Sequence, residues 1–236
     1  MLKEFFMPDP TYKQMTANYN KRDMFVAVCV YIFIILLYLG AGYLHFTVGL
    51  RSTSVYTNIL LSLVVVAVIL FRKQKLNTAG FTINHFKKAF IVGLVFGIIF
   101  SIPGFFSAIK AGLPLNSLGV TIWNIFFTII IVLPEEIIFR GYIQTRLYGV
   151  IKSDLLAMSI GSIMFSLAHI PYNLFDGSSG YVLGFFMYNS LWLLQVLVMH
   201  FIFSFLFRKY NSIVTSTVCH FIINLSTALF FGMLLQ

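Results

Sequence analysis

The sequence predicts an all-α protein, a polytopic bundle of about seven transmembrane helices with its N-terminus in the cytoplasm. Of the 236 residues, 59% are hydrophobic and only 10% are charged, whereas soluble domains carry about 25% charged residues. The apolar residues also form long runs, and a spanning helix needs about 20 of them. The strands of a membrane barrel need only about ten alternating residues, so the long runs favour helices.

Seven apolar runs justify the expected helices in chain order. They cover residues 24–48, 55–71, 89–109, 117–133 and beyond, 154–170, 180–207 and 211–235. No connection is long enough to separate two soluble domains. We therefore expect one transmembrane domain at 24–236, preceded at 1–23 by a cytoplasmic segment that is either an interfacial helix or a frayed tail.

The basic residues indicate the orientation. Of the 16 Lys and Arg, all but Arg51 and Lys110 fall in the N-terminal segment or in alternate connections, with Arg140 and Arg146 counted in the connection after the fourth run. The positive-inside rule places such connections in the cytoplasm, so a seven-span chain ends outside. Nucleic acid is not an expected partner, because the net charge of +9 is spread over short connections rather than gathered on a soluble face.

The two cysteines, Cys29 and Cys219, both lie inside apolar runs. A disulfide framework is not indicated by such a pair. We expect both to be small buried hydrophobic residues.

Two adjacent glutamates, Glu135 and Glu136, interrupt the fourth apolar run directly after Pro134. An ionisable group in the bilayer needs a partner or a function. Glu136 precedes Arg140 by four residues, the favoured order for an ion pair on one helix face. Glu135 points elsewhere without a local partner, and an unpaired carboxylate beside a paired one suits a general base. The alternative is a packing network that holds both glutamates. Pro134 predicts a kink in the helix directly before them.

Histidines on later runs supply possible partners for Glu135. His169 lies near the end of the fifth run, and His220 lies in the seventh, four residues before Asn224 on the same helix face. A single histidine in a bundle is commonly a hydrogen-bonding residue. Two histidines with Asn224 and Glu135 on three helices instead favour a catalytic site.

Three further histidines lie outside these motifs. His45 has no assignment. We expect His85, in a basic loop, to be solvated, and His200 to form a hydrogen bond across helices.

The three motifs together resemble one known family. Glu135-Glu136-x-x-x-Arg140, Phe165-x-x-x-His169 and His220-x-x-x-Asn224 are similar to the motifs of the CPBP family, which comprises CAAX prenyl endopeptidases with bacteriocin-processing and self-immunity relatives. The resemblance covers about residues 117–235 and implies a multi-pass intramembrane endopeptidase in a prokaryotic plasma membrane. Its substrate would be a peptide or protein within or at the bilayer. A prenylated C-terminus, a leader peptide and a signalling peptide are the open choices.

The resemblance also implies roles for the residues. Glu135 would activate water with help from His169, while His220 and Asn224 would polarise the scissile carbonyl and hold its oxyanion. Glu136 and Arg140 would order the site.

A metal is the main open question about the chemistry. Two histidines and a carboxylate can ligate zinc with an open water position, and Glu135, His169 and His220 would then be the ligands. The sequence has no HExxH motif, which marks the usual zinc-protease helix. We therefore expect water activation without a metal or other cofactor.

Other functions fit parts of the sequence. A scaffold or immunity protein of the same fold would act by binding alone, and a small transporter would use the intramembrane charges as an ion path. A serine protease would use the Gly-Ser-Ser-Gly segment at 177–180, which is equally typical of a turn.

Overall fold

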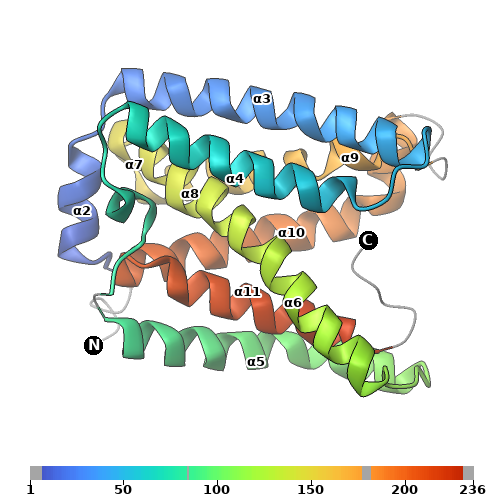
Figure 1. The fold of residues 1–236 in the computed structure, drawn as a ribbon. Coiled ribbons are helices and arrows are strands. Elements are labelled where there is room, and N and C mark those ends of the chain that lie inside the picture. Colours follow the sequence, from blue (N-terminus) through green and yellow to red (C-terminus); the bar gives the residue numbers. More distant parts are fainter. Residues whose placement is uncertain (1–6, 84, 177–181, 231–236) are drawn as a thin grey trace.

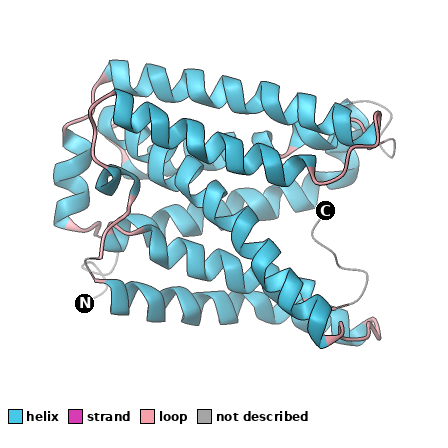
Figure 2. Cartoon of the chain, in the orientation of Figure 1, coloured by secondary structure: helices cyan, strands magenta, loops and turns pink. Residues whose placement is uncertain are grey.

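The chain folds into a bundle of helices (Figures 1 and 2). The computed structural model describes residues 7–83, 85–176 and 182–230, with side chains at 182 and 183 excepted. The helices are α2 (Pro10–Ala17), α3 (Lys21–Phe46), α4 (Thr53–Phe71), η1 (Leu76–Ala79), α5 (Phe86–Lys110), α6 (Leu118–Glu135), η2 (Glu136–Gln144), α7 (Thr145–Val150), α8 (Asp154–Ala168), α9 (Ile170–Asn173), α10 (Val182–Tyr210) and α11 (Ile213–Ala228).

The apolar helices confirm the predicted polytopic membrane bundle. Within the described residues, six helices are long and apolar enough to cross a membrane, and Ile213–Ala228 is a shorter apolar helix in the place of the seventh run. Large apolar side chains such as Phe25 and Phe106 point outward from the bundle, with exposed fractions of 66% and 64%. A lipid environment accepts such side chains without cost.

Close helix packing brings the C-terminal part of the chain onto α5. Figure 1 shows α5 and α11 side by side, and α3 beside α4 on the opposite side of the molecule. A Cβ atom at Gly97 would lie 2.8 Å from the Ile222 side chain, so glycine permits this approach. Small residues at such contacts are typical of membrane helices.

The segment before the first span is a helix rather than a frayed tail. The Asp9 side chain accepts a hydrogen bond from the Thr11 backbone at the start of α2. Tyr12 is 2% exposed, and its ring makes edge contacts with Tyr148 and Phe207. The expectation of a frayed tail is therefore wrong for the described residues of this segment, because Tyr12 anchors it to α7 and α10.

The fourth span continues as a helix past Pro134. It is helical from Leu118 to Val150, and the stretch Glu136–Gln144 is π-helical. Pro134 has no backbone N–H, so the regular hydrogen-bond pattern is interrupted just before this stretch. Single π-helical turns occur frequently at functional sites.

The basic residues of this span are also placed differently from the sequence-based count. Arg140 lies in η2 and Arg146 in α7, and both are almost fully buried. They belong to the helix and not to the connection after it. The predicted orientation does not depend on these two residues, because the Lys and Arg of the loops and of the N-terminal segment still lie mainly at one end of the bundle.

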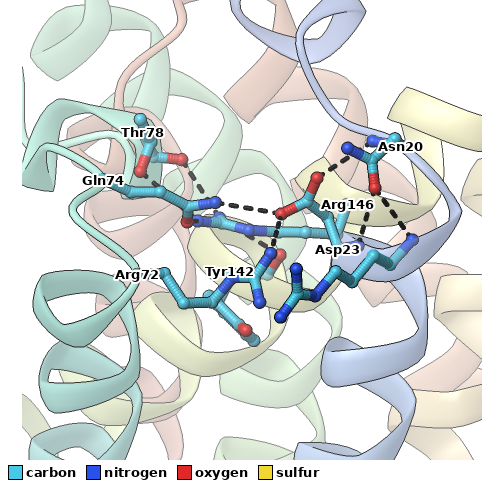
Figure 3. A network of polar contacts seen from close by, with 8 residues as sticks. Asn20, Asp23, Arg72, Gln74, Thr78, Tyr142 and Arg146 are labelled. Atoms are coloured by element: carbon cyan, nitrogen blue, oxygen red, sulfur yellow. Dashed lines mark hydrogen bonds and ion pairs between the residues drawn. The ribbon is translucent and has the colours of Figure 1, made fainter.

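A polar network closes one end of the bundle (Figure 3). The Arg146 guanidinium donates to the Gln74 side chain at 2.6 Å and to the Gly141 carbonyl at 3.1 Å. Gln74 in turn donates to Asp23 at 3.1 Å, which also pairs with Arg72 at 2.6 Å. This network joins the start of α3, the segment after α4 and the end of the fourth span.

The cysteine prediction is half right. Both cysteines are free thiols; Cys219 is buried, but Cys29 is exposed on α3. Its position on the outward face of an apolar helix explains why an apolar run does not imply burial in a membrane bundle.

Candidate active site

Four of the six candidate residues line one cavity, which we call the main cavity. Glu135 ends α6, His169 follows α8, and His220 and Asn224 lie on α11. The cavity has a volume of about 590 Å³, and its wall also includes Phe165, Trp192, Met199 and Phe203. The fold thus brings together side chains that are up to 89 positions apart (135 and 224).

Glu136 and Arg140 form the predicted ion pair behind this cavity. Glu136 Oε1 lies 3.1 Å from the Arg140 guanidinium nitrogen Nη1, and both side chains are 0% exposed. The Arg140 guanidinium carbon lies 4.2 Å from the centre of the Phe165 ring and 5.0 Å from that of Phe203. Cation–π contacts strengthen when they are desolvated. The two rings therefore help to stabilise a buried charge whose nitrogens make no hydrogen bond within the described residues.

Glu136 also holds His220. Its Oε1 atom lies 2.8 Å from His220 Nδ1, and because a carboxylate only accepts, Nδ1 carries the proton. The imidazole ring stacks on Phe203 with centroids 4.9 Å apart. His220 is thus oriented by a carboxylate that is itself neutralised by Arg140.

The other nitrogen of His220 faces the main cavity. Its Nε2 atom lies 3.3 Å from the Asn224 amide nitrogen and 4.0 Å from Glu135 Oε2. Glu135, His220 and Asn224 therefore meet at one point, as the spacing of their motifs suggested.

His169 is held in one tautomer. Its Nδ1 atom lies 2.8 Å from the Phe165 backbone carbonyl, so Nδ1 donates and Nε2 keeps a free lone pair. The ring also contacts Trp192 edge-on at 5.5 Å. A neutral imidazole with an accepting nitrogen at a cavity wall can take a hydrogen bond from water.

Glu135 differs sharply from its neighbour. Its side chain is 15% exposed and makes no hydrogen bond to another described residue, although it interacts electrostatically with Arg140 and His169. It lines the main cavity and a second, smaller one of about 130 Å³, which we call the side cavity. Both glutamates contact His220, Glu136 at 2.8 Å and Glu135 at 4.0 Å, but of the two only Glu136 is hydrogen-bonded to a described residue.

The candidate zinc ligands are Glu135, His169 and His220. Among the described residues, no group of three or more His, Cys, Asp and Glu side chains is arranged to hold a metal ion. His220 Nδ1 already bonds Glu136, and its Nε2 faces Asn224. As placed, Glu135, His169 and His220 do not fit a zinc site.

Several contacts were not foreseen from the sequence. Trp192 had no assignment, and no local spacing distinguishes it from other aromatic residues of the spans. His200 bonds across helices as expected, with its Nε2 3.4 Å from the Gln144 side-chain oxygen.

The other sequence-based expectations have mixed outcomes. His85 is half exposed, but its Nε2 lies 3.4 Å from Asp9, so it is not simply a solvated side chain. His45 stacks on Tyr172 with centroids 5.7 Å apart. The segment 177–180 lies outside the described residues.

Comparison with known proteins supports the resemblance. Residues 117–226 match the family model Rce1-like, described as type II CAAX prenyl endopeptidase Rce1-like. No curated protein and no solved structure matches the chain. The matched segment contains Glu135, His169 and Asn224 together with the rest of the cavity motifs, so the CPBP resemblance is confirmed at family level.

Proposed function

We propose that the chain hydrolyses a peptide bond inside the membrane with a Glu135-activated water. The premise is the match of residues 117–226 to the type II CAAX prenyl endopeptidase model. The main supporting observation is the convergence of Glu135, His169, His220 and Asn224 on one cavity. The proposed site lies in a single transmembrane domain, residues 24–236, of a prokaryotic plasma-membrane protein.

The proposed first step is proton transfer from water. Glu135 takes one proton while His169 Nε2 accepts a hydrogen bond from the same water. The water oxygen then attacks the carbonyl carbon, and the electrons of the C=O double bond move to its oxygen. Positioned general bases of this kind contribute about 10²–10⁴ in rate, and a dry cavity strengthens the electrostatic interactions involved.

The proposed second step is collapse of the tetrahedral intermediate. The oxyanion is held by His220, which Glu136 orients through Nδ1, together with the Asn224 amide. Glu135 returns its proton to the leaving nitrogen as the C–N bond breaks. The products are a carboxylic acid and an amine, and no metal takes part in the proposal.

The substrate is a membrane-associated peptide or protein. Phe165, Phe185, Trp192, Met199 and Phe203 give the main cavity an extensive apolar wall, which suits a hydrophobic segment or a lipid group better than a soluble peptide. A prenylated C-terminus, a leader peptide and a signalling peptide all satisfy this requirement.

The test compares the new N-termini in the membrane proteome of cells that carry wild type, Glu135→Gln or Asp154→Asn at matched levels. Asp154 is the matched acidic control, because it lines neither cavity and its 51% exposed side chain pairs only at the start of α8, with Arg208 at 2.6 Å. We expect a set of cleavage products that is present with wild type and Asp154→Asn and absent with Glu135→Gln.

The opposite results identify the alternative functions. Products that persist with Glu135→Gln would overturn the catalytic role of this residue. If no products depend on the chain and Glu135→Gln still rescues a deletion phenotype, the protein acts as a scaffold or immunity protein. Solute uptake into vesicles that depends on Glu136 or His169 would indicate a transporter.

A further inference from the structure

The side cavity lies beside the proposed catalytic residues, and part of its wall comes from an earlier segment of the chain. It shares Glu135, His169 and Trp192 with the main cavity. The remainder of its wall includes Tyr38 on α3 and Asn58 on α4. Both residues precede the segment 117–226 that matches the family.

Two polar side chains in this wall are held inside apolar helices. Tyr38 is 8% exposed and Asn58 is 4% exposed, and the Tyr38 hydroxyl donates a hydrogen bond to Asn58 Oδ1. Burying an amide costs free energy unless it is hydrogen-bonded. The Asn58 Nδ2 group makes no hydrogen bond to another described residue, so its hydrogens are available for a ligand in the cavity.

The ligand chemistry follows from the size and the lining. A volume of about 130 Å³ exceeds the roughly 10–15 Å³ that one water requires, but it is small for a peptide. Asn58 offers donors, and Glu135 and His169 Nε2 offer acceptors. Tyr38 and Glu135 are also close enough to interact electrostatically. A short chain of hydrogen-bonded waters satisfies all of these groups.

We propose that the side cavity is the water supply of the site, in which Asn58 and Tyr38 hold water against Glu135 and His169. This proposal rests on the proposed function, because it assigns the source of the water that Glu135 activates. A peptide seated in the main cavity displaces the water there. Glu135 lines both cavities and can therefore take its water from the side cavity while a peptide occupies the main one. Asn58 and Tyr38 act on the reaction through that water and are positioning residues.

The test uses two substitutions at one position. Leu at 58 fills the site with an apolar side chain, whereas Ala leaves a space that water can enter. A purely structural role of Asn58, as acceptor for Tyr38, is lost in both variants. Both variants also lose the Asn58 amide, but only Asn58→Leu excludes the further water that can take its place, so the two explanations predict different orders of activity.

The activity assay uses the full chain in detergent and a quenched peptide carrying the strongest Glu135-dependent cleavage site from the proteome comparison. We expect Asn58→Leu to lower kcat at least about tenfold with KM unchanged, since misplacing a reacting group is costly. Asn58→Ala should keep most of the wild-type kcat. Ser62→Ala is the matched control on α4, because Ser62 lines neither cavity and donates to the Ile59 carbonyl of its own helix.

A second measurement does not depend on cleavage or on the variants folding. X-ray radiolysis oxidises side chains that lie next to bound water. Phe139 is 2% exposed and lines only the side cavity, so we expect its oxidation in the wild-type protein. Phe207, which is 0% exposed in the core, should stay unmodified.

The outcomes separate this proposal from the one on which it rests. If Asn58→Leu keeps the wild-type kcat, if Asn58→Ala falls as far as Asn58→Leu, or if Phe139 is not oxidised, the water supply is not in the side cavity. If Glu135→Gln cleaves the peptide like wild type, the proposed function itself is wrong.

Discussion

Two adjacent glutamates occupy opposite environments in this protein. Glu136 is 0% exposed and shared by Arg140 and His220, while Glu135 faces two cavities without a hydrogen bond to another described residue. The same side chain therefore serves as a structural anchor at one position and as a candidate base at the next. Their separation is a consequence of helix rotation of about 100° per residue.

The two positions should respond differently to the same change. Glu136→Gln removes the charge that Arg140 and His220 share, and breaking a buried ion pair costs about 3–5 kcal/mol of stability. Glu135→Gln removes no hydrogen bond to a described residue and should unfold near the wild-type temperature. Thermal unfolding of both variants in detergent checks this, and equal losses of stability would contradict it.

Arg140 depends on its shape as well as its charge. Its guanidinium lies against the rings of Phe165 and Phe203, and lysine keeps the charge but has no planar group to stack there. We expect Arg140→Lys to lose about 1–2 kcal/mol of stability and to reduce cleavage, because Glu136 and His220 shift with it. Arg22→Lys, on the exposed first turn of α3, is the control. A fully active and stable Arg140→Lys would rule out the stacking role.

At the scale of elements, the π-helical stretch η2 is the part that carries the ion pair. It packs against η1 so closely that a Cβ atom at Gly141 would lie 2.6 Å from the Ala79 carbonyl oxygen. Backbone cannot yield to such a contact as a flexible side chain can. Gly141 therefore sets the distance between the fourth span and the segment after α4.

Paired glycine substitutions test this contact. Gly141→Ala should destabilise the protein by about 1–3 kcal/mol through overpacking. Gly119→Ala is the matched control, because nothing lies within 4 Å of its added Cβ atom and alanine favours a helix by about 1 kcal/mol over glycine. Unfolding temperatures measured side by side should move in opposite directions. A neutral Gly141→Ala would mean that η1 moves away freely.

For the whole molecule, the distribution of charge predicts the orientation in the membrane. Lys73 and Lys75 follow α4, and Lys87 and Lys88 lie at the start of α5, whereas Lys110 lies at the other end of α5. The positive-inside rule places the first group in the cytoplasm. The polar network of Asp23, Arg72, Gln74 and Arg146 lies at this same end of the bundle (Figure 3).

Cysteine labelling measures this orientation. In a Cys29→Ala background, which removes the exposed thiol, a membrane-impermeant maleimide should label Lys110→Cys in intact cells. It should label Lys75→Cys only after the membrane is permeabilised. The reverse pattern would show that the N-terminus lies outside.

The helices and the local half of the site could be predicted from the sequence. The length of the apolar runs predicts helices that span a bilayer in six of the seven cases within the described residues, because an unpaired backbone group in lipid is too costly for other structures. The Glu136–Arg140 pair follows from a spacing of four residues, and the three motifs identify the site residues as candidates.

The tertiary structure alone decided which helices meet. The bond between Glu136 and His220 joins positions 84 residues apart, and the contact of Tyr38 and Asn58 with the cavity beside Glu135 leaves no periodic signal in the chain. Membrane helices are apolar on every side, so hydropathy specifies that each one spans the bilayer but not which face it turns toward its neighbours. That choice is made by close packing and by a few buried polar contacts.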